Sequence, residues 1–453
     1  MSKAWLATNF NPYQRQVLTD ALAIAQGYDL QIYAVGGIVR DWLLLSQLIS
    51  HPATNPAIAN PEWPDLDLVV AGRDRAGILI AIALHRLYPA SQLQIHEKFQ
   101  TAELIWQVAA TGHNFTLDLA TARTEIYSYP GANPQVEAAS LLQDLQRRDF
   151  TINAIAIPLT TQDHLEIIDP HQGISDLDQK QIRAIRPGSF IEDPRRIYRA
   201  VRFAVRFSFQ LHPHTELEIR QTTASGIHAG IGGSRLKAEI YYLLAFSPAQ
   251  TSQMWRSLAG LGGLGCIYDP FPLDPRFKTS WQRWQRWQYW FPSFFGDFSQ
   301  QAPERNFLFL LSDLGRLFAQ TPNQAPNLQL SGLQLSQLSQ VGQLTRAEFC
   351  YSHSASRLVK QLEKFHPLSL LIHATKTSDR YQRRLIWQYF HQWRQIQSPL
   401  DGTALIQLGC PRGKFVGELL QLLRTAALEN QIGSLDQAKQ LAQDWIKAAS
   451  SPH

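Results

Sequence analysis

The sequence has few of the residues that build disulfide frameworks and thiolate metal sites. It contains three cysteines in 453 residues, Cys266, Cys350 and Cys410, with no CxxC pair and no Cys/His spacing between them. Disulfide-rich secreted domains and structural zinc sites both need such closely spaced ligands. We therefore expect neither, and widely separated cysteines are typical of proteins in a reducing cytoplasm.

Long apolar runs and a strong charge imbalance are also missing. The opening MSKAWLATNF lacks a basic region followed by an apolar stretch, and no apolar segment reaches membrane-spanning length. The formal net charge is +5, a mild excess that suits a polyanionic partner only where the basic side chains cluster. We expect a cytoplasmic protein without a membrane anchor.

The residues that are present are sufficient for several folded domains. Hydrophobic residues make up 45% of the chain and charged residues 17%, which describes a folded protein too long for one ordinary core. Strand patterns alternate with helical patterns up to about residue 157, and beyond residue 176 the apolar spacing is almost entirely helical. The pattern predicts an α/β or α+β first part and a helical second part.

Two carboxylates stand side by side at the start of an apolar strand pattern, in PEWPDLDLVVAG. Strand geometry places Asp65 and Asp67 on one face, where like charges repel each other. A divalent cation makes such a pair favourable, because Mg²⁺ takes carboxylate and phosphate oxygens as ligands. Two such ions stabilise the attacking and leaving oxygens of a phosphoryl transfer. Taken alone, the pattern equally describes a capped turn followed by a solvent-facing aspartate.

A glycine pair precedes the two aspartates, in AVGGIVRD. Gly36 and Gly37 stand between a predicted strand and a predicted helix, where backbone N–H groups approach phosphates closely. Arg40 follows one helical turn later, within reach of a triphosphate oxygen. A plain strand-to-helix turn explains this segment if it is considered alone. The two patterns together are more specific than either part.

The combined motif resembles the class II tRNA nucleotidyltransferases, or CCA-adding enzymes, and the related bacterial poly(A) polymerases. These families belong to the DNA polymerase beta-like nucleotidyltransferase superfamily. The resemblance covers roughly residues 30 to 245 and implies an α+β fold, with a small mixed β-sheet and helices in a catalytic head. An all-helical neck, body and tail are expected to follow. The domain boundaries implied are 1–157 for the head, 158–245 for the neck, 246–340 for the body and 341–453 for the tail.

A second family motif is matched by LQRRDFTINAIA, residues 145–156. The resemblance implies a strand-to-helix position that places Arg148 near the triphosphate and Asp149 and Asn153 near the ribose hydroxyls. The local alternative is the start of a capped amphipathic helix, with Asp149 near its N-terminus.

The nucleotide-selecting motif is matched by EDPRRIYRAVRFAVRF, residues 192–207. By resemblance, Asp193 and Arg196 read the Watson–Crick edge of the incoming base, since a carboxylate accepts from amino groups and a guanidinium donates to ring nitrogens or carbonyls. Arg199 and Arg202 lie on the same helix flank as Arg196, and we expect them to face phosphate or to hold Asp193. A solvated basic helix face is the alternative.

Three further segments match the family less directly. Asp169 and Gly173 match a short third motif that we interpret as a structural turn. Arg235 and Glu239 match a fifth motif expected to support the neck, and we predict no site there. Asp118, in FTLDLATARTE, is a candidate third carboxylate that acts as base for the primer hydroxyl; a surface-facing strand residue is the alternative.

Two segments carry predictions about RNA. In LDGTALIQLGCPRGKFVGELLQLL, Arg412 and Lys414 fit contacts to the tRNA backbone, or an ordinary helix-loop-helix turn. In WQRWQRWQYW, three tryptophans share one helix flank and predict a buried aromatic seam; stacking on RNA bases between the interleaved arginines is the alternative. The insertion at residues 46–64 is interpreted as a surface loop.

The complete interpretation is a template-independent, Mg²⁺-dependent transfer of CMP and AMP from CTP and ATP to the tRNA 3′ end. Residues 124–140 form a long segment with Gly and Pro of the kind that permits conformational change, which weighs against CC-only addition. Addition of CCA, of the terminal A alone and poly(A) synthesis remain open, as does a small chance of an inactive RNA-binding relative. The expected partners are the tRNA 3′ end and acceptor arm, with no obligate protein partner.

Overall fold

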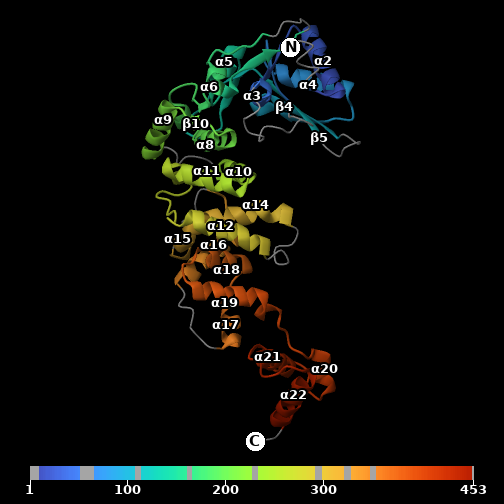
Figure 1. Cartoon of the computed structure of the whole chain (residues 1–453). Coiled ribbons are helices and arrows are strands. Elements are labelled where there is room, and N and C mark those ends of the chain that lie inside the picture. Colours follow the sequence, from blue (N-terminus) through green and yellow to red (C-terminus); the bar gives the residue numbers. More distant parts are fainter. Residues whose placement is uncertain are drawn as a thin grey trace. The chain divides into compact units, whose positions relative to one another are not determined.

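The computed structural model describes residues 10–50, 66–107, 114–160, 166–226, 233–290, 298–320, 328–346 and 354–450. The chain folds into two compact units (Figure 1). The first comprises residues 1–271 with 327–329, and the second comprises residues 272–326 with 330–453. Asp65, Cys350 and most of the predicted insertion lie outside the described residues.

A six-stranded mixed sheet forms the centre of the head, in the order β3-β4-β5-β2-β1-β8. β2 and β5 pair in parallel and the other neighbours are antiparallel. The strands are β1 (Gln31–Val35), β2 (Leu66–Ala71), β3 (Gln92–His96), β4 (Thr101–Gln107), β5 (Asn114–Thr121) and β8 (Ala156–Pro158). The mixed sheet confirms the predicted α+β class.

Helices cover the sheet because its apolar side chains alternate between two faces. α4 (Ala76–Leu87) packs across β2, β3, β4 and β5 on one face, and α2 (Pro12–Gly27) packs against α4. On the other face, Val35 and Val69 pack against Leu141 and Leu145 of α5 (Leu141–Gln146). Asp67 alternates in step with Val69 along β2, so it belongs to the face that α5 covers.

Local sequence signals set the ends of these helices. Asn11 closes a capping box with Gln14 at the start of α2, and Ser140 does the same with Gln143 at the start of α5. α3 (Gly37–Ser50) begins directly after the glycine pair that ends β1. A short hairpin of β6 (Arg123–Ile126) and β7 (Gln135–Ala138) precedes α5.

The second family motif was predicted at a strand-to-helix junction, and that prediction is wrong. Arg148 follows α5 and precedes the 3₁₀ turn η3 (Thr151–Asn153) and strand β8, so the order is helix, turn, strand. The predicted turn at Asp169 is confirmed as structural. Its carboxylate accepts from the N–H groups of Gly173 and Ile174, at 2.7 and 2.9 Å.

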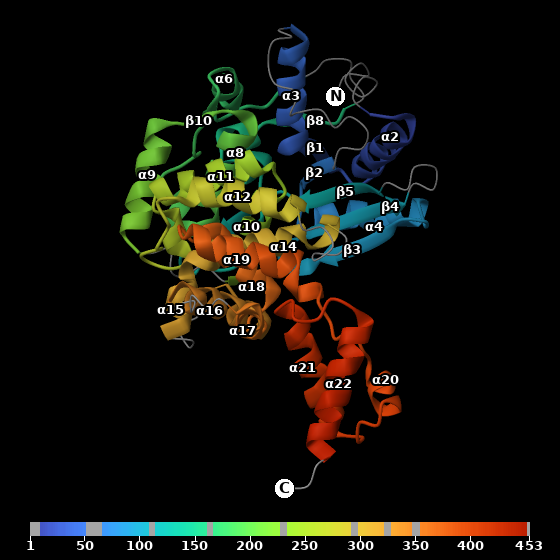
Figure 2. The same cartoon turned by 60° about the horizontal axis from the view of Figure 1, so that its bottom comes forward.

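The remainder of the first unit is helical and is centred on α8 (Arg195–Phe207), which packs against α10 and α11 (Figure 2). The other elements are α6 (Gly173–Asp178), β9 (Gln181–Ile182), α7 (Ser189–Glu192), β10 (Gln210–Leu211), α9 (Pro213–Ala224), α10 (Gly233–Leu244), α11 (Pro248–Gly260) and η5 (Gly263–Cys266). α8 buries Ile197, Tyr198 and Val201 and turns its arginines the other way.

The second unit is helical throughout its described residues. Its elements before the tail are α12 (Phe277–Trp290), α14 (Phe298–Leu311), η6 (Ser312–Leu314), α15 (Gly315–Gln320), α16 (Gly332–Arg346), α17 (Ala355–Leu362), α18 (Pro367–Lys376), α19 (Arg380–His391) and η7 (Trp393–Gln395). Trp281, Trp284 and Trp287 are 2%, 0% and 6% exposed, which confirms the predicted aromatic seam.

The last three helices of this unit share a core of their own. α20 (Gly402–Gln407), α21 (Lys414–Leu428) and α22 (Leu435–Ser450) lie against one another in Figures 1 and 2. The buried residues of this core all lie between Leu400 and Ala442. Among the helices the structure describes, none is long and apolar enough to cross a membrane.

Candidate active site

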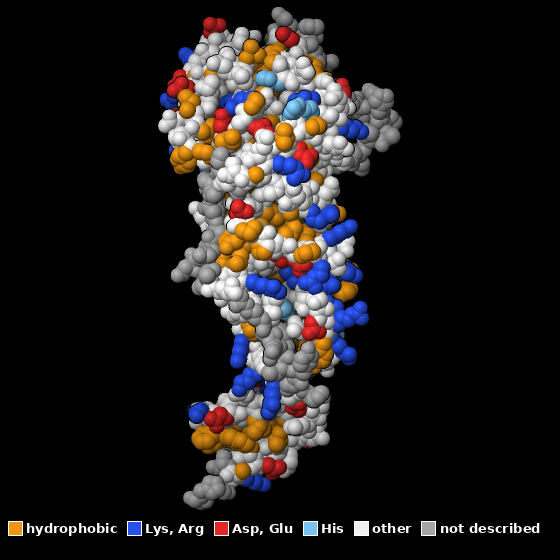
Figure 3. Space-filling view, turned by 90° about the vertical axis from the view of Figure 1, so that its left-hand side faces the viewer, with side chains coloured by type: hydrophobic (Ala, Val, Ile, Leu, Met, Phe, Trp, Pro, Cys, Tyr) orange, Lys and Arg blue, Asp and Glu red, His pale blue; other side chains and the backbone are white. Residues whose placement is uncertain are grey.

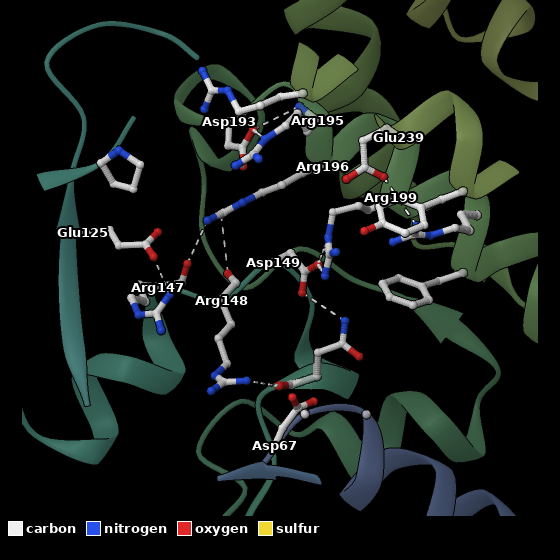
Figure 4. A pocket seen from close by; sticks show the side chains of 18 of the residues that line it. Asp67, Glu125, Arg147, Arg148, Asp149, Asp193, Arg195, Arg196, Arg199 and Glu239 are labelled. Atoms are coloured by element: carbon white, nitrogen blue, oxygen red, sulfur yellow. Dashed lines mark hydrogen bonds and ion pairs between the residues drawn. The ribbon is translucent and has the colours of Figure 1, made fainter. Parts of the chain in front are cut away.

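An arginine-rich cavity of about 1120 Å³ opens in the first unit (Figure 4). Its walls come from the β1–α3 turn, β2, the β6–β7 hairpin, the segment after α5, and helices α8 and α10. Ten arginines and five carboxylates line it. The arginines are Arg40, Arg123, Arg147, Arg148, Arg195, Arg196, Arg199, Arg202, Arg206 and Arg235, and the carboxylates are Asp67, Glu125, Asp149, Asp193 and Glu239.

The predicted glycine turn lies at one wall of this cavity. Gly36 has a φ of +72°, a conformation that favours glycine, and a Cβ there would lie 3.3 Å from Nη1 of Arg148 and 3.7 Å from Oδ2 of Asp67. The turn therefore brings the backbone, a guanidinium and a carboxylate together. Arg40 is 4% exposed, and its Nη1 donates to Asn153 Oδ1 at 2.6 Å. Burial lowers the pKa of Arg40, while the neighbouring Asp41 raises it in part.

Asp67 and Asp118 are direct neighbours in the parallel pairing of β2 with β5. Their side chains belong to the same face of the sheet because the two strands run in register. Asp67 lines the cavity, whereas Asp118 is exposed and does not contribute to the lining. No group of three or more Asp, Glu, His or Cys suited to a metal ion occurs among the described residues, which exclude Asp65.

Asp144 organises two of the cavity arginines, and the sequence analysis did not identify it. Its Oδ1 lies 2.6 Å from Arg147 and its Oδ2 lies 2.9 Å from Arg148. The carboxylate is fully buried. Burial raises its pKa, but the two guanidinium groups outweigh burial and hold the pKa below the ordinary value. Its spacing, three and four residues before two arginines on one helix, is a signal that was available in the sequence.

Asp149 lies at the centre of a hydrogen-bonded network. Its Oδ1 accepts from the Asn153 side chain at 3.0 Å, and its Oδ2 accepts from Arg199 Nε at 2.6 Å. Burial raises the pKa of Asp149, but Arg199 and the hydrogen bond from Asn153 lower it to about 2 overall. Asn153 in turn accepts from Arg40, so one network connects α3, η3 and α8.

The predicted base-selecting pair lies in the cavity wall, but its two members have different partners. Asp193 accepts from Arg195 at two atoms, Nε at 2.8 Å and Nη2 at 2.7 Å. Arg196 donates to the backbone carbonyl of Arg147 at 2.8 Å and to the Ser189 hydroxyl. Figure 4 shows Arg196 reaching toward the segment that carries Arg147 and Arg148. We expected Arg199 or Arg202 to hold Asp193, and the structure assigns that role to Arg195.

Residues of α10 also line the cavity, where the sequence analysis predicted no site. Glu239 faces Arg202 across 3.5 Å and is 6% exposed. Burial raises the pKa of Glu239, and the arginines of α8 offset part of that increase. Arg235 donates to the carbonyls of Gly131 and Ala132, at the tip of the β6–β7 hairpin. The fifth motif therefore borders the cavity as well as supporting the neck.

The arrangement suits a polyphosphate ligand. Arginines outnumber carboxylates in the cavity, and guanidinium groups bind phosphate oxygens with paired hydrogen bonds. Asp67 supplies a hard oxygen ligand beside the glycine turn. The tail residues Arg412 and Lys414 belong to a different part of the chain. They lie in the turn between α20 and α21, where both are exposed and Lys414 faces Glu418 at 3.4 Å.

Comparisons with known proteins agree with this geometry. Residues 32–183 match the family model of the poly A polymerase head domain. An A-adding tRNA nucleotidyltransferase of Geobacter sulfurreducens is 29% identical over 433 residues, which cover 94% of this chain and 46% of that protein. One of Halalkalibacterium halodurans is 27% identical over 449 residues, covering 95% and 92%. A solved CCA-adding enzyme in complex with ATP has a TM-score of 0.73 at 23% identity, covering 99% and 97%.

The mixed sheet, the glycine turn and the arginine-rich cavity define a protein with a nucleotidyltransferase head. The chain belongs to the family of class II tRNA nucleotidyltransferases and related bacterial poly(A) polymerases. It spans about half the length of the Geobacter sulfurreducens relative and nearly all of the Halalkalibacterium halodurans relative.

Proposed function

We propose that this protein transfers nucleotidyl groups from ATP or CTP to the 3′ end of tRNA, completing the CCA end or adding its final A. The observation that carries the proposal is the cavity that joins Asp67, the glycine turn and ten arginines in one unit. Such a reaction depends on positioning and charge neutralisation, which these groups supply. The proposal implies a location where tRNA and nucleoside triphosphates occur together, the cytoplasm.

The triphosphate has a natural place beside the glycine turn. The backbone at Gly36 and Gly37 precedes a helix N-terminus, which favours negative charge. Arg148 lies next to Gly36, and Asp144 holds its guanidinium in place. Arg40 supports the same wall through Asn153. We assign the triphosphate tail to this wall and the ribose to the side of Asp149 and Asn153.

The residues beside the turn also fit Mg²⁺. Asp67 contributes a carboxylate to the cavity, and Asp65 precedes it by two residues, which is the ligand type this ion prefers. When bound there, Mg²⁺ neutralises triphosphate charge and orients the reacting oxygens. Asp118 stands beside Asp67 in the sheet and remains the candidate acceptor for the proton of the attacking 3′-hydroxyl.

Base selection is assigned to Asp193 and Arg196. Asp193 accepts hydrogen bonds, and its ionised form is favoured because Arg195 offsets the cost of burial and keeps its pKa below the ordinary value. Arg196 is fixed by the carbonyl of Arg147, so it presents donors from a defined position. A fixed acceptor and a fixed donor can distinguish bases by their Watson–Crick edges.

The names of the relatives favour one end product. Those of Geobacter sulfurreducens and Halalkalibacterium halodurans are both A-adding tRNA nucleotidyltransferases, and the solved relative is a CCA-adding enzyme in complex with ATP. Addition of the final A is therefore our first expectation for this chain. Addition of all three nucleotides and synthesis of a poly(A) tract differ from it only in product length.

The test is a sequencing gel of tRNA transcripts incubated with purified protein, Mg²⁺ and nucleotides. One transcript lacks the whole 3′ tail and another ends in CC. Extension of the CC transcript by one A, with the tailless transcript unchanged, identifies an A-adding enzyme. Extension of the tailless transcript by three nucleotides identifies a CCA-adding enzyme, and a long A ladder identifies a poly(A) polymerase. Failure to extend any transcript refutes the proposal.

A single substitution tests the assignment of Asp67. We expect Asp67→Asn to abolish extension and to leave tRNA binding unchanged, because the substitution removes one charged ligand and keeps the side-chain volume. The exposed Asp436→Asn is the matched control and retains full activity. An Asp67→Asn protein that extends tRNA at the normal rate contradicts the assignment.

A further inference from the structure

A groove in the second unit combines exposed arginines with tryptophan rings. It has a volume of about 380 Å³ and is lined by seven residues of α12 and α19. We call it the Arg/Trp groove; its residues are Arg283, Arg286, Trp287, Trp290, Arg383, Arg384 and Trp387. α12 and α19 each carry three basic side chains and no acidic one. The groove is therefore positively charged on both sides.

The charge of the groove is not balanced from within. None of its four arginines has a carboxylate within ion-pair distance among the residues that the structure describes. Burial lowers the pKa of Arg283, and the neighbouring Arg383 and Arg286 lower it further. On the face shown in Figure 3, Lys and Arg side chains likewise gather over the part of the second unit that precedes the tail. Like charges held together become favourable when an anion binds between them.

The four arginines fall into two pairs with different surroundings. Arg283 donates to the carbonyl of Thr375 at 2.5 Å, and Arg383 donates to the carbonyl of Thr377 at 2.7 Å. Both carbonyls belong to the C-terminal end of α18, so this pair is fixed against the body. Arg286 and Arg384 are exposed and are the pair available to a ligand.

The rings define the shape of the groove. Trp387 lies edge-on to Trp287, with centroids 5.6 Å apart and planes at 74°, and edge-on to Trp290, at 5.4 Å and 86°. Trp287 is 6% exposed and belongs to the buried seam, whereas Trp290 is 51% exposed. The seam therefore ends in an open ring that projects into a cationic groove.

We propose that the Arg/Trp groove binds an RNA strand, with phosphates on Arg286 and Arg384 and an unpaired base stacked on Trp290. This inference rests on the proposed function, because it makes the tRNA substrate the occupant. Base stacking on aromatic rings beside a cationic track is the usual way in which proteins hold unpaired nucleotides. A cationic ligand is excluded by the four guanidinium groups, and an acidic peptide does not use an exposed indole face.

The first test measures binding of a tRNA transcript that lacks its 3′ tail. We expect the double variant Arg286→Gln/Arg384→Gln to raise the Kd about tenfold at physiological salt. The slope of log K against log salt is expected to become shallower by about 1.5 to 2, since each lost phosphate contact removes about 0.9. The matched control is Arg73→Gln/Arg86→Gln, two exposed head arginines outside both cavities. Equal Kd and slope in the test variant and wild type overturn the proposal.

The second test examines the ring. Trp290→Phe keeps a stacking surface and is expected to bind the transcript within about twofold of wild type, whereas Trp290→Ala weakens binding at least about fivefold. Equal binding by both variants overturns the stacking contact. All variants are expected to keep the wild-type kcat at saturating tRNA, because none of these residues lines the catalytic cavity.

These results separate the inference from the proposed function. A wild-type protein that binds the transcript but never extends it refutes the function and leaves the groove test valid. A wild-type protein that extends the transcript, with groove variants that bind it equally well, refutes the groove alone.

Discussion

At the scale of single residues, two glycines with the same backbone conformation separate strain from function. Gly36 and Gly188 have φ values of +72° and +78°. A Cβ at Gly188 has nothing within 4 Å, whereas one at Gly36 meets Arg148 and Asp67. We expect alanine at either position to cost about 1–2 kcal/mol of stability.

Only Gly36→Ala is expected to reduce nucleotide addition, by tenfold or more in kcat/KM for ATP, because only there does the methyl group displace site residues. The checks are urea unfolding and single-turnover extension for both variants. Comparable activity loss in Gly188→Ala means that backbone strain alone explains the effect at Gly36.

The buried carboxylate of Asp149 makes a second prediction, about pH. Its folded pKa of about 2 lies below the ordinary 3.8, so the ionised form stabilises the fold above about pH 4. That stabilisation, about 2 kcal/mol, is lost as pH falls from about 4 toward 2. Asp149→Asn should therefore unfold at lower denaturant than wild type at pH 7, and the difference should narrow below pH 4.

Denaturant titrations from pH 7 to pH 3 measure this narrowing, with the exposed Asp436→Asn as the control that shows no such trend. A difference between wild type and Asp149→Asn that stays constant over this range contradicts the assigned role of Arg199 and Asn153.

Residue identities predicted the composition of the site better than its pairings. Gly36, Asp67, Arg148 and Asp193 were identified from motifs, and all line one cavity. The partner of Asp193 was not predicted, because Arg195 lies two residues away and reaches the carboxylate only after the turn at Pro194 directs it there. Which arginine of several neighbours pairs with a carboxylate depends on backbone direction, and sequence spacing does not determine it.

At the scale of elements, the β6–β7 hairpin is attached to the neck by its tip. Arg235 of α10 donates to the carbonyls of Gly131 and Ala132, and the N–H of Gly131 donates to the carbonyl of Glu192 at 2.9 Å. Asn133 and Pro134 follow the tip and line the cavity. The segment predicted to permit conformational change is thus held by one guanidinium and one backbone bond.

We expect Arg235→Met to release the hairpin tip, because it removes both side-chain donors and keeps much of the length. Amide hydrogen exchange over residues 127–134 should become faster, and incorporation of UTP and GTP relative to ATP should rise. Arg206→Met, which changes another cavity arginine away from the hairpin, is the control. Unchanged exchange in Arg235→Met shows that other contacts hold the tip.

Elements were predicted where the apolar pattern was long and missed where it was short. The strands at 66–71, 101–107 and 114–121 were expected, because several consecutive residues are buried on both faces. Strands β3, β7 and β8 have three to five residues, and their pairing partners decide their conformation. The same limitation explains the reversed order at Arg148, since the three residues of β8 follow the motif and gain their partners only from β1.

At the scale of the whole molecule, the tail is the part whose removal the remainder should tolerate. Its core lies within residues 400–442, and few polar contacts connect it to the helices before it. Arg424 pairs with Glu363 at 2.6 Å, and Glu429 accepts from Ser354 and Ser356. A chain that ends at Ser398 should therefore keep a folded head and bind ATP with the wild-type affinity.

The same truncation should weaken tRNA binding, because it removes an exposed basic turn at Arg412 and Lys414. We expect KM for tRNA to rise about tenfold while kcat at saturating tRNA stays within twofold, since phosphate contacts position the RNA without taking part in the chemistry. The double variant Arg412→Gln/Lys414→Gln should reproduce most of the rise if those side chains carry the contact. Lys439→Gln/Lys447→Gln, on exposed positions of α22, controls for charge alone. A truncated chain with the wild-type KM means that the turn is only a connection between two helices, and the Arg/Trp groove then carries the RNA contact of the second unit.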